Sequence, residues 1–223
     1  MKQLKPLIIT FFVLALTVFA IIYAIPAIQF KVHGTEEEKK GGKDMVLKNY
    51  GVAIDSAAHV FNINPSYLKA LCFLECSGRK VFDQRFEPHV YRKLKSVKFN
   101  MMDNYEHVTS NLLLDASDEA LKNLASSWGP FQLMGYKCLL LDIKVRDIRG
   151  DESVFYGVKW IDMTYGKYLR DGKYRDAFHI HNTGMPYPNS GTPRTYDPNY
   201  CQRGVELMKW FDEHPNFNDA IIN

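Results

Sequence analysis

The feature that most constrains this chain is a long uncharged segment near its N-terminus. From Pro6 to Phe30 the sequence has 25 residues without a charge. A bilayer core about 30 Å thick requires about 20 apolar helical residues, so this segment is long enough to span a membrane. A cleavable signal peptide usually has a shorter apolar region of about 7–15 residues, although small residues at Ala24 and Ala27 leave cleavage open. We therefore expect an uncleaved transmembrane signal anchor over residues 6–30.

The charges that flank this segment predict its orientation. Lys2 and Lys5 lie in the short tail formed by residues 1–5, and basic residues favour the cytoplasmic side of a membrane. This predicts a cytoplasmic tail, a single pass and a main domain outside the cytoplasm. Four lysines beyond the segment weaken the charge difference on which this prediction depends: Lys31, Lys39, Lys40 and Lys43.

The rest of the chain divides into a linker and one domain. Residues 31–43 are charged, contain glycine and lack apolar periodicity, which is typical of a solvated linker. From Asp44 onward apolar residues recur every three to four positions, as on the buried face of a helix. Strand-like alternation is scarce and there is no internal repeat. We therefore predict a single, mainly α-helical domain over residues 44–223.

Local signals place several helices within this domain. Asn64 followed by Pro65 predicts a helix start, because the asparagine side chain caps free N–H groups and proline has a preset φ. This helix is expected to end near Ser77-Gly78. Amphipathic patterns predict further helices over residues 153–169 and 199–211, and Ser117 or Asp115 is expected to cap another. Residues 183–198 are rich in Gly, Pro, Asn and Thr and predict a loop.

Charge and composition argue against several classes of function. Beyond residue 30 there are 26 basic and 25 acidic residues and no Lys/Arg-rich block, so no nucleic-acid partner is expected. The histidines show no recognised metal-ligand spacing, and neither a metal nor another cofactor is predicted. The even number of cysteines allows either disulfides, with Cys72 or Cys76 joined to Cys138 or Cys201, or free buried thiols.

Glu75 is the first candidate for chemistry. It lies in the last turn of its predicted helix, beside Phe73 and Leu74. The partial negative charge of a helix C-terminus disfavours a carboxylate, and apolar surroundings act in the same direction. Both effects favour the protonated carboxyl group, and a proton donor is what cleavage of a glycosidic bond requires. Taken alone, however, a solvated glutamate at a helix end is the more common interpretation.

The sequence around Glu75 favours the catalytic interpretation. The stretch Asn64–Gly78 reads NPSYLKALCFLECSG and resembles the opening of the lytic transglycosylase and goose-type lysozyme superfamily, in which a helix starts after Asn/Asp-Pro and ends in Glu-Ser-Gly. The resemblance implies a lysozyme-like fold with Glu75 as the catalytic acid. Here Cys76 separates Glu75 from Ser77, which departs from the family pattern.

Further segments resemble the same superfamily in the same order, over roughly residues 50–210. Residues 86–91 (FEPHVY) and 125–135 (ASSWGPFQLMG) are similar to signatures of the N-acetylmuramidase family of phage endolysins. His181-Asn182-Thr183-Gly184 occupies the place of Tyr-Asn-x-Gly, with histidine replacing tyrosine, and the segment from Tyr200 resembles a Tyr-Val-x-x-Val helix start. The block around Trp128 is the most specific of these.

These motifs supply candidate substrate-binding residues. A glycine backbone allows close approach of a sugar ring, aromatic rings can stack on sugars, Gln132 offers a donor and acceptors, and Tyr200 is expected to donate a hydrogen bond to Glu75. Aromatic residues such as Trp128 and Phe131 are more often core residues than binding residues. The predicted substrate-binding residues are Ser127, Trp128, Gly129, Gln132, Asn182 and Tyr200.

A second carboxylate is left open, with Asp83 and Glu87 as the nearest candidates in the sequence. The resemblance implies that Glu87 is a fixed residue of the site, where it acts as a catalyst or orients His89 or its helix. A hydrolase uses a second carboxylate to activate water or to attack the sugar. Lytic transglycosylases use one glutamate, and the substrate's own hydroxyl attacks to form a 1,6-anhydro sugar.

The resemblance therefore implies an enzyme of bacterial peptidoglycan. We expect a lytic transglycosylase or muramidase that cleaves the β-1,4 bond between N-acetylmuramic acid and N-acetylglucosamine. We expect the protein to be tethered to the inner membrane, with its domain in the periplasm or another extracytoplasmic space. The expected partners are glycan strands, the inner membrane and an envelope machinery. The alternative is a non-catalytic peptidoglycan-binding scaffold subunit of such a machinery. A cysteine peptidase based on Cys76, His181 and Asn182 is disfavoured, because a helix C-terminus disfavours a thiolate.

Overall fold

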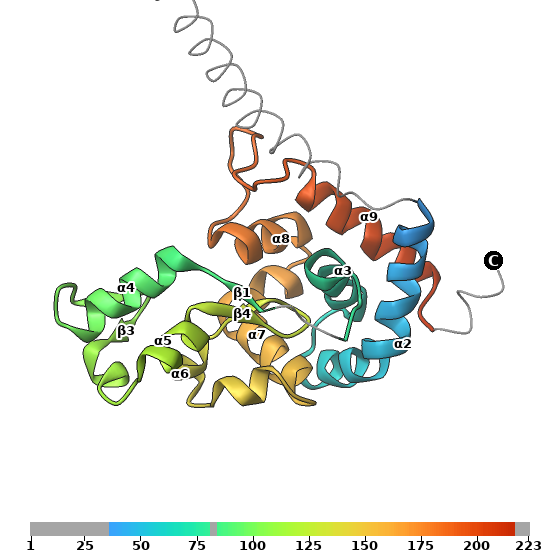
Figure 1. Cartoon of the computed structure of the whole chain (residues 1–223). Coiled ribbons are helices and arrows are strands. Elements are labelled where there is room, and N and C mark those ends of the chain that lie inside the picture. The colour runs from blue at the N-terminus through green and yellow to red at the C-terminus, as the bar shows by residue number, and fades with distance from the viewer. Residues whose placement is uncertain (1–35, 81–83, 217–223) are drawn as a thin grey trace, which may run out of the picture. The chain divides into compact units, whose positions relative to one another are not determined.

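The computed structural model describes residues 36–80 and 84–216, and these residues are mainly helical, as predicted (Figure 1). The predicted tail 1–5, the predicted membrane segment 6–30 and Asp83 lie outside the described residues. Within the described ranges, no helix combines the length and the apolar character needed to cross a membrane. Residues from Gly41 onward form a compact unit separate from residues 1–40, and the following description concerns that unit.

The first helix, α2, covers Glu36–Phe61 and begins inside the segment predicted as a linker. The segment predicted as a linker is thus helical from Glu36 to Lys43. The segment is rich in Glu and Lys, which are good helix formers, so a helix does not need an apolar stripe at this end. Gly42 is buried, and a Cβ there would lie 2.8 Å from the Phe73 ring, so the packed domain already includes this residue.

The helix that contains Glu75, α3, covers Pro65–Cys76 and has the predicted boundaries. The Asn64 side chain accepts a hydrogen bond from the backbone N–H of Ser66 at 2.8 Å. At the other end Ser77 and Gly78 both have positive φ, 52° and 71°, and Ser77 donates its N–H to the Phe73 carbonyl. This left-handed ending terminates the helix directly after Glu75 and Cys76.

Six further α-helices follow within the described residues. The predicted loop of residues 183–198 separates the last two, and Ser117 caps α5 by accepting the Ala120 N–H. Their bounds are α4 Pro88–Lys98, α5 Asp118–Leu124, α6 Lys137–Leu141, α7 Ser153–Arg170, α8 Tyr174–Thr183 and α9 Tyr200–Glu213. Two 3-10 helices, Ser110–Leu113 and Val145–Ile148, complete the helical structure.

Two small antiparallel sheets lie among these helices. The first has the order β1-β4-β5, from Arg85–Phe86, Ser126–Trp128 and Leu133–Met134. The second is a hairpin of β2, Asn104–Tyr105, and β3, Val108–Thr109. Strands of two or three residues are too short to show alternation in a sequence, and the sequence therefore did not reveal them.

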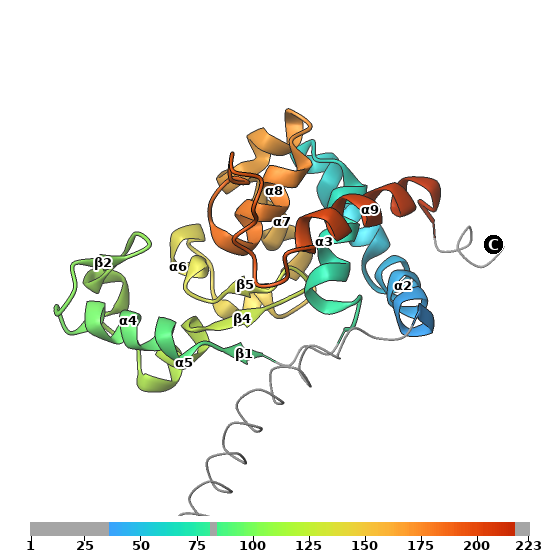
Figure 2. The same cartoon turned by 90° about the horizontal axis from the view of Figure 1, so that it is seen from above.

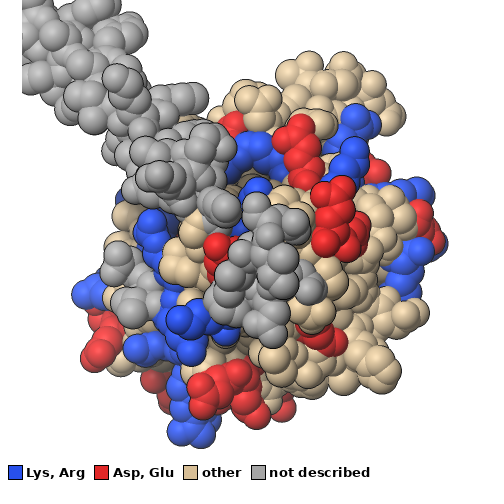
Figure 3. Space-filling model, turned by 90° about the vertical axis from the view of Figure 1, so that its right-hand side faces the viewer, with Lys and Arg blue, Asp and Glu red and all other residues tan. Residues whose placement is uncertain are grey.

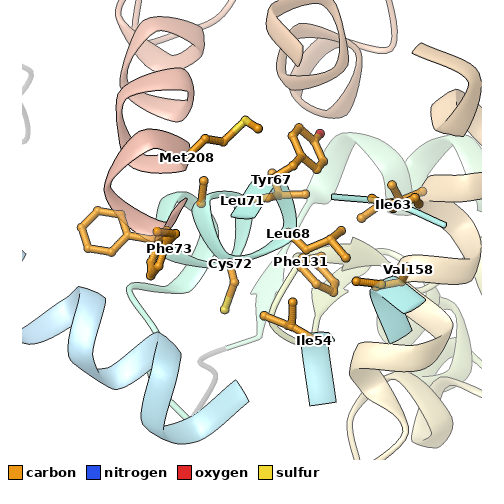
Figure 4. Packing of buried hydrophobic residues seen from close by; sticks show 14 of the residues in the cluster. Ile54, Ile63, Tyr67, Leu68, Leu71, Cys72, Phe73, Phe131, Val158 and Met208 are labelled. Atoms are coloured by element: carbon orange, nitrogen blue, oxygen red, sulfur yellow. The ribbon is translucent and has the colours of Figure 1, made fainter. Parts of the chain in front are cut away.

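The buried residues divide into a large cluster and smaller ones. The large cluster, called here the helical core, joins α2, α3, α7, α8 and α9. Figure 4 shows α3 at its centre, with side chains extending toward Met208 of α9 and toward Ile54, Phe131 and Val158. A second cluster, called here the small core, joins α4, α5, β3 and Tyr136, and a third surrounds Trp128. In Figures 1 and 2, α4 and α5 lie on one side of the β1-β4 strands and α3, α8 and α9 on the other.

The surface matches the balanced charge of the sequence. On the face that Figure 3 displays, Lys and Arg are intermixed with Asp and Glu, and apolar and uncharged residues lie between them. No large area of a single charge is visible on the described part of this face.

Candidate functional site

Glu75 lies in a protected position at the end of α3. Only 17% of its side chain is exposed. Tyr200, the first residue of α9, donates its hydroxyl proton to Glu75 Oε1 over 2.5 Å, which is the contact expected from the sequence. Burial is the main cause that raises the pKa of Tyr200, so its hydroxyl stays protonated and remains a donor. The carboxyl group is therefore held in one orientation by a residue that is 125 positions away in the chain.

His181 is the second neighbour of Glu75. Its Nε2 lies 3.9 Å from Glu75 Oε1 and 3.1 Å from the backbone carbonyl oxygen of Phe131. A carbonyl only accepts hydrogen bonds, so Nε2 must carry the proton. Burial lowers the pKa of His181, and this outweighs the attraction of the nearby Glu75 carboxylate, which favours the charged ring. The ring is therefore neutral and protonated at Nε2.

Two tyrosines hold this ring from its other side. With Nε2 protonated, Nδ1 must accept, and the Tyr165 hydroxyl donates to it at 2.7 Å. The Tyr67 hydroxyl in turn donates to the oxygen of Tyr165 at 3.4 Å. Helix α7 departs from helical geometry at Tyr165, where φ is −145° and ψ is 18°. A chain of hydrogen bonds thus runs from the helical core to His181, beside Glu75.

A cleft of about 710 Å³ adjoins this group of residues. Tyr165 and His181 line it, and the opposite wall comes from the start of α4, the β2–β3 turn and α6. Ligand pockets commonly have volumes of about 300–1,000 Å³. The residues predicted from the sequence that line the cleft are Glu87, Gln132 and Asn182. Glu75 and Tyr200 are not among the lining residues, and the link between Glu75 and the cleft is His181, which lines it.

Gln132 is fixed at the cleft by its own β-turn. Its φ is +48°, in the left-handed region that disfavours residues other than glycine. Its side-chain oxygen accepts from the Ser127 hydroxyl at 2.8 Å, and its side-chain nitrogen donates to the Gly129 carbonyl at 3.2 Å. An amide has two N–H donors and two lone pairs. One donor and one lone pair of Gln132 therefore remain for a ligand in the cleft.

Trp128, Gly129 and Phe131 have structural roles. Trp128 is 5% exposed and donates its indole N–H to the Asn123 carbonyl, and Phe131 is 2% exposed in the helical core. Gly129 has a φ of +71°, and a Cβ there would lie 2.7 Å from the Ile148 carbonyl oxygen. The glycine is thus required by the turn and by the neighbouring backbone. Neither aromatic side chain presents a free ring face on which a sugar can stack.

Glu87 and Asn182 occupy the edges of the cleft. Glu87 precedes α4, is 23% exposed, and makes an ion pair with Arg85 at 2.9 Å. Its other oxygen lies 3.6 Å from His89 Nδ1. Orientation of His89 is the role that the sequence analysis gives Glu87 as the alternative to catalysis. Asn182 is exposed at the C-terminal end of α8.

The structure adds cleft residues that the sequence reasoning missed. Trp160, Thr164 and Tyr165 of α7 line the cleft, as do Glu106 and Lys137. Trp160 and Thr164 are four residues apart and share a helix face, so their spacing was an available signal. The Glu106-His107 turn contains neither Gly nor Asn, the residues that usually identify a two-residue hairpin loop, and gave no signal.

All four cysteines are free thiols. The Cys76 sulfur lies 3.7 Å from that of Cys72 and also bonds to the Cys72 carbonyl. A hydrogen bond from the Cys72 thiol lowers the pKa of Cys76, whereas burial raises that of Cys72. The thiolate is therefore disfavoured at Cys72, by burial rather than by the helix end, and not at Cys76. Among the described residues, the polar contacts of His181 are with Glu75, Phe131 and Tyr165 and with no cysteine.

Within residues 36–80 and 84–216, no group of three or more His, Cys, Asp or Glu side chains is arranged to hold a metal ion. The candidate site thus consists of a carboxyl group, a neutral imidazole and several hydroxyl and amide groups beside a cleft. Comparisons with protein-family models, with characterised proteins and with solved structures find no match for this chain.

Proposed function

We propose that this protein has a lysozyme-like fold and cleaves peptidoglycan glycan strands, with Glu75 as the catalytic acid. The bond cut is the β-1,4 bond between N-acetylmuramic acid and N-acetylglucosamine, and the enzyme is a lytic transglycosylase or an N-acetylmuramidase. One observation carries the proposal: the Glu75 carboxyl is 17% exposed, bonded to Tyr200, and 3.9 Å from a histidine that lines a cleft of about 710 Å³.

In the first step Glu75 protonates the bridging oxygen of the glycosidic bond. Tyr200 donates to Oε1, which leaves Oε2 to hold the proton that is transferred. Protonation converts the bridging oxygen into a good leaving group, and general acid catalysis of this kind contributes about 10²–10⁴-fold to a rate. Because burial keeps His181 neutral, this histidine places no full positive charge beside the carboxyl group.

In the second step the ionised Glu75 acts as a base. In a transglycosylase it removes the proton from the muramyl hydroxyl, whose oxygen then closes the 1,6-anhydro ring. In a muramidase water attacks instead. The contacts of Glu75 are to a tyrosine and a histidine, and Glu87 is engaged by Arg85 and His89. A muramidase reaction that uses a second carboxylate would draw on Glu87, which lines the cleft, or on Asp83.

Gln132 and Asn182 are proposed to hold the sugars. After its hydrogen bonds to Ser127 and Gly129, the Gln132 amide retains one donor and one lone pair. These suit the hydroxyl and acetamido groups of a sugar. Asn182 is exposed on the cleft wall next to His181. We further propose that residues 6–30 tether the enzyme to the bacterial inner membrane, with the domain and its glycan substrate outside the cytoplasm.

The test is muropeptide release from purified peptidoglycan by the full chain and by the Glu75→Gln variant. We expect a loss of at least about 100-fold in the variant, because the amide cannot donate the proton. Glu119→Gln is the matched control, since Glu119 is exposed on α5, and it should retain full activity. Mass spectrometry then assigns the reaction, because an anhydro end is one water lighter than a reducing end.

The other outcomes also decide between functions. Equal activity of the parent and Glu75→Gln would reject Glu75 as the acid. Absence of cleavage by both proteins, together with retained binding to peptidoglycan, would favour the non-catalytic scaffold subunit of an envelope machinery.

A further inference from the structure

The wall of the cleft opposite His181 contains a polar group that the proposed reaction does not use. Glu106 is the first residue of the two-residue turn between β2 and β3 and lines the cleft with Lys137 and Trp160. Tyr136 and Lys137 both donate to Glu106 Oε2, each at 2.6 Å. Within the described residues no hydrogen bond to Oε1 is present, and the side chain is 49% exposed. One carboxylate oxygen is thus fixed and the other is available to a ligand.

The turn itself is unusual for its sequence. Glu106 and His107 have φ values of 44° and 70°, the two positive values that a type I′ turn requires. Asn-Gly, Asp-Gly or Gly-Gly usually fill these positions. Residues other than glycine keep a positive φ where the surrounding structure fixes them, and such residues are often found at ligand sites. The bonds from Tyr136 and Lys137 provide that fixation for Glu106.

The charge of this group restricts what it binds. Partial burial acts to raise the pKa of Glu106, but the hydrogen bonds from Lys137 and Tyr136 outweigh it, so the pKa lies below its ordinary value and the group is ionised. Lys137 neutralises this charge across 2.6 Å. The ion pair carries no net charge. It therefore suits a neutral ligand that has hydrogen-bond donors better than it suits a ligand with a single ammonium group, which needs an uncompensated negative charge.

Lys137 also connects the pair to aromatic rings. Its Nζ lies 4.8 Å from the centroid of Tyr136 and 4.7 Å from that of Trp160. Trp160 is half-buried on α7 and lines the cleft. Ionic, hydroxyl and aromatic groups therefore meet at one place on the wall, which is the mixture that a sugar ring with polar edges and apolar faces requires.

We propose that Glu106, Lys137 and Trp160 form a second saccharide-binding subsite, in which Glu106 Oε1 accepts hydrogen bonds from a hydroxyl or acetamido N–H of an N-acetylhexosamine. Its ligand class rests on the proposed function. Glu106 and Lys137 belong to other elements than His181, and the subsite is assigned a sugar other than the one that Glu75 protonates. Its removal should weaken substrate binding and raise KM, with kcat changed little.

The experiment measures binding in the absence of cleavage. The full chain with Glu75→Gln is titrated calorimetrically with N-acetylchitohexaose, a neutral β-1,4-linked hexasaccharide. The titration is repeated with double variants in which Glu106→Gln, Lys137→Met or Glu119→Gln is combined with Glu75→Gln. We expect Glu106→Gln and Lys137→Met to weaken binding about 5–20-fold, and Glu119→Gln to leave it unchanged. Two substitutions on different elements guard against local misfolding as the cause.

A second probe, a stem peptide with a free amine and no sugar, tests the charge argument. Its binding should not depend on Glu106. Unchanged hexasaccharide affinity in both subsite variants, or a loss confined to the peptide, would overturn the proposal. If cleavage does not depend on Glu75 while sugar binding still depends on Glu106, the proposed reaction is rejected and the proposed subsite is retained. If cleavage needs Glu75 but sugar binding ignores Glu106, the subsite alone fails.

Discussion

The two walls of the cleft are supported in different ways. Behind His181 and Glu75 lies the helical core, in which Tyr67, Leu68, Leu71 and Cys72 of α3 are all fully buried. Behind Glu106 lies only the small core, and the side chain is held by polar contacts at the surface. Packing fixes a group more rigidly than exposed polar contacts do. The difference agrees with the two proposals, which assign the chemistry to the first wall and the adjustment of substrate binding to the second.

The largest expected effect is on the stability of the two cores. Leu71→Ala and Leu113→Ala each remove a fully buried leucine, one from the helical core and one from the small core. We expect a loss in the free energy of unfolding of roughly 3–5 kcal/mol for Leu71→Ala and roughly 2–3 kcal/mol for Leu113→Ala, since the smaller cluster collapses more easily around the cavity. Urea denaturation measures both. An equal or reversed order would remove the proposed difference between the two walls.

A smaller effect is expected for Tyr200→Phe. The ring keeps its packing, but Glu75 loses the hydroxyl that donates to Oε1. A hydrogen bond to a charged or proton-transferring group is worth about 1.5–3 kcal/mol, so kcat on peptidoglycan should fall roughly 10–100-fold with KM little changed. Tyr187→Phe is the matched control, because it removes a hydroxyl that donates to the Gly191 carbonyl instead. A change in KM alone would move Tyr200 from the chemical step to binding.

The smallest expected effect is a pH dependence that separates the two walls. The pKa of His181 lies below its ordinary value of 6.5 in the folded protein, so the unfolded chain binds a proton first as pH falls. His181 therefore reduces stability progressively below about pH 6.5. The pKa of Glu106 is also lowered, from 4.5, so its contribution is present above about pH 4.5 and is lost only below that value.

Measured between pH 7.5 and 5, the free energy of unfolding of His181→Gln should consequently fall less steeply than that of the parent, whereas Glu106→Gln should keep the parental slope. Glutamine retains both a donor for the Phe131 carbonyl and an acceptor for Tyr165. Identical slopes for the parent and His181→Gln would show that another group is responsible for the acid sensitivity.

Local signals in the sequence were sufficient for much of the fold. The cap at Asn64, the break at Ser77-Gly78 and the loop of residues 183–198 are all present, because each depends on neighbouring residues and backbone preferences. The helical conformation of residues 36–43 was not predicted, since a helix of charged residues leaves no apolar period to detect. The short strands were missed for a similar reason, as two residues have no pattern.

What the sequence determined about the site is the chemical nature and helix-end position of Glu75 and the presence of Gln132, Asn182 and Tyr200. Only the tertiary structure decided that His181 is neutral, that Trp128 and Phe131 are core residues, and that Glu106, Lys137 and Trp160 face the same cleft. Helix caps and breaks depend on contacts a few residues apart, which a sequence displays directly. Burial, tautomer and the meeting of distant side chains depend on packing between elements, and that packing is fixed only when the whole domain folds.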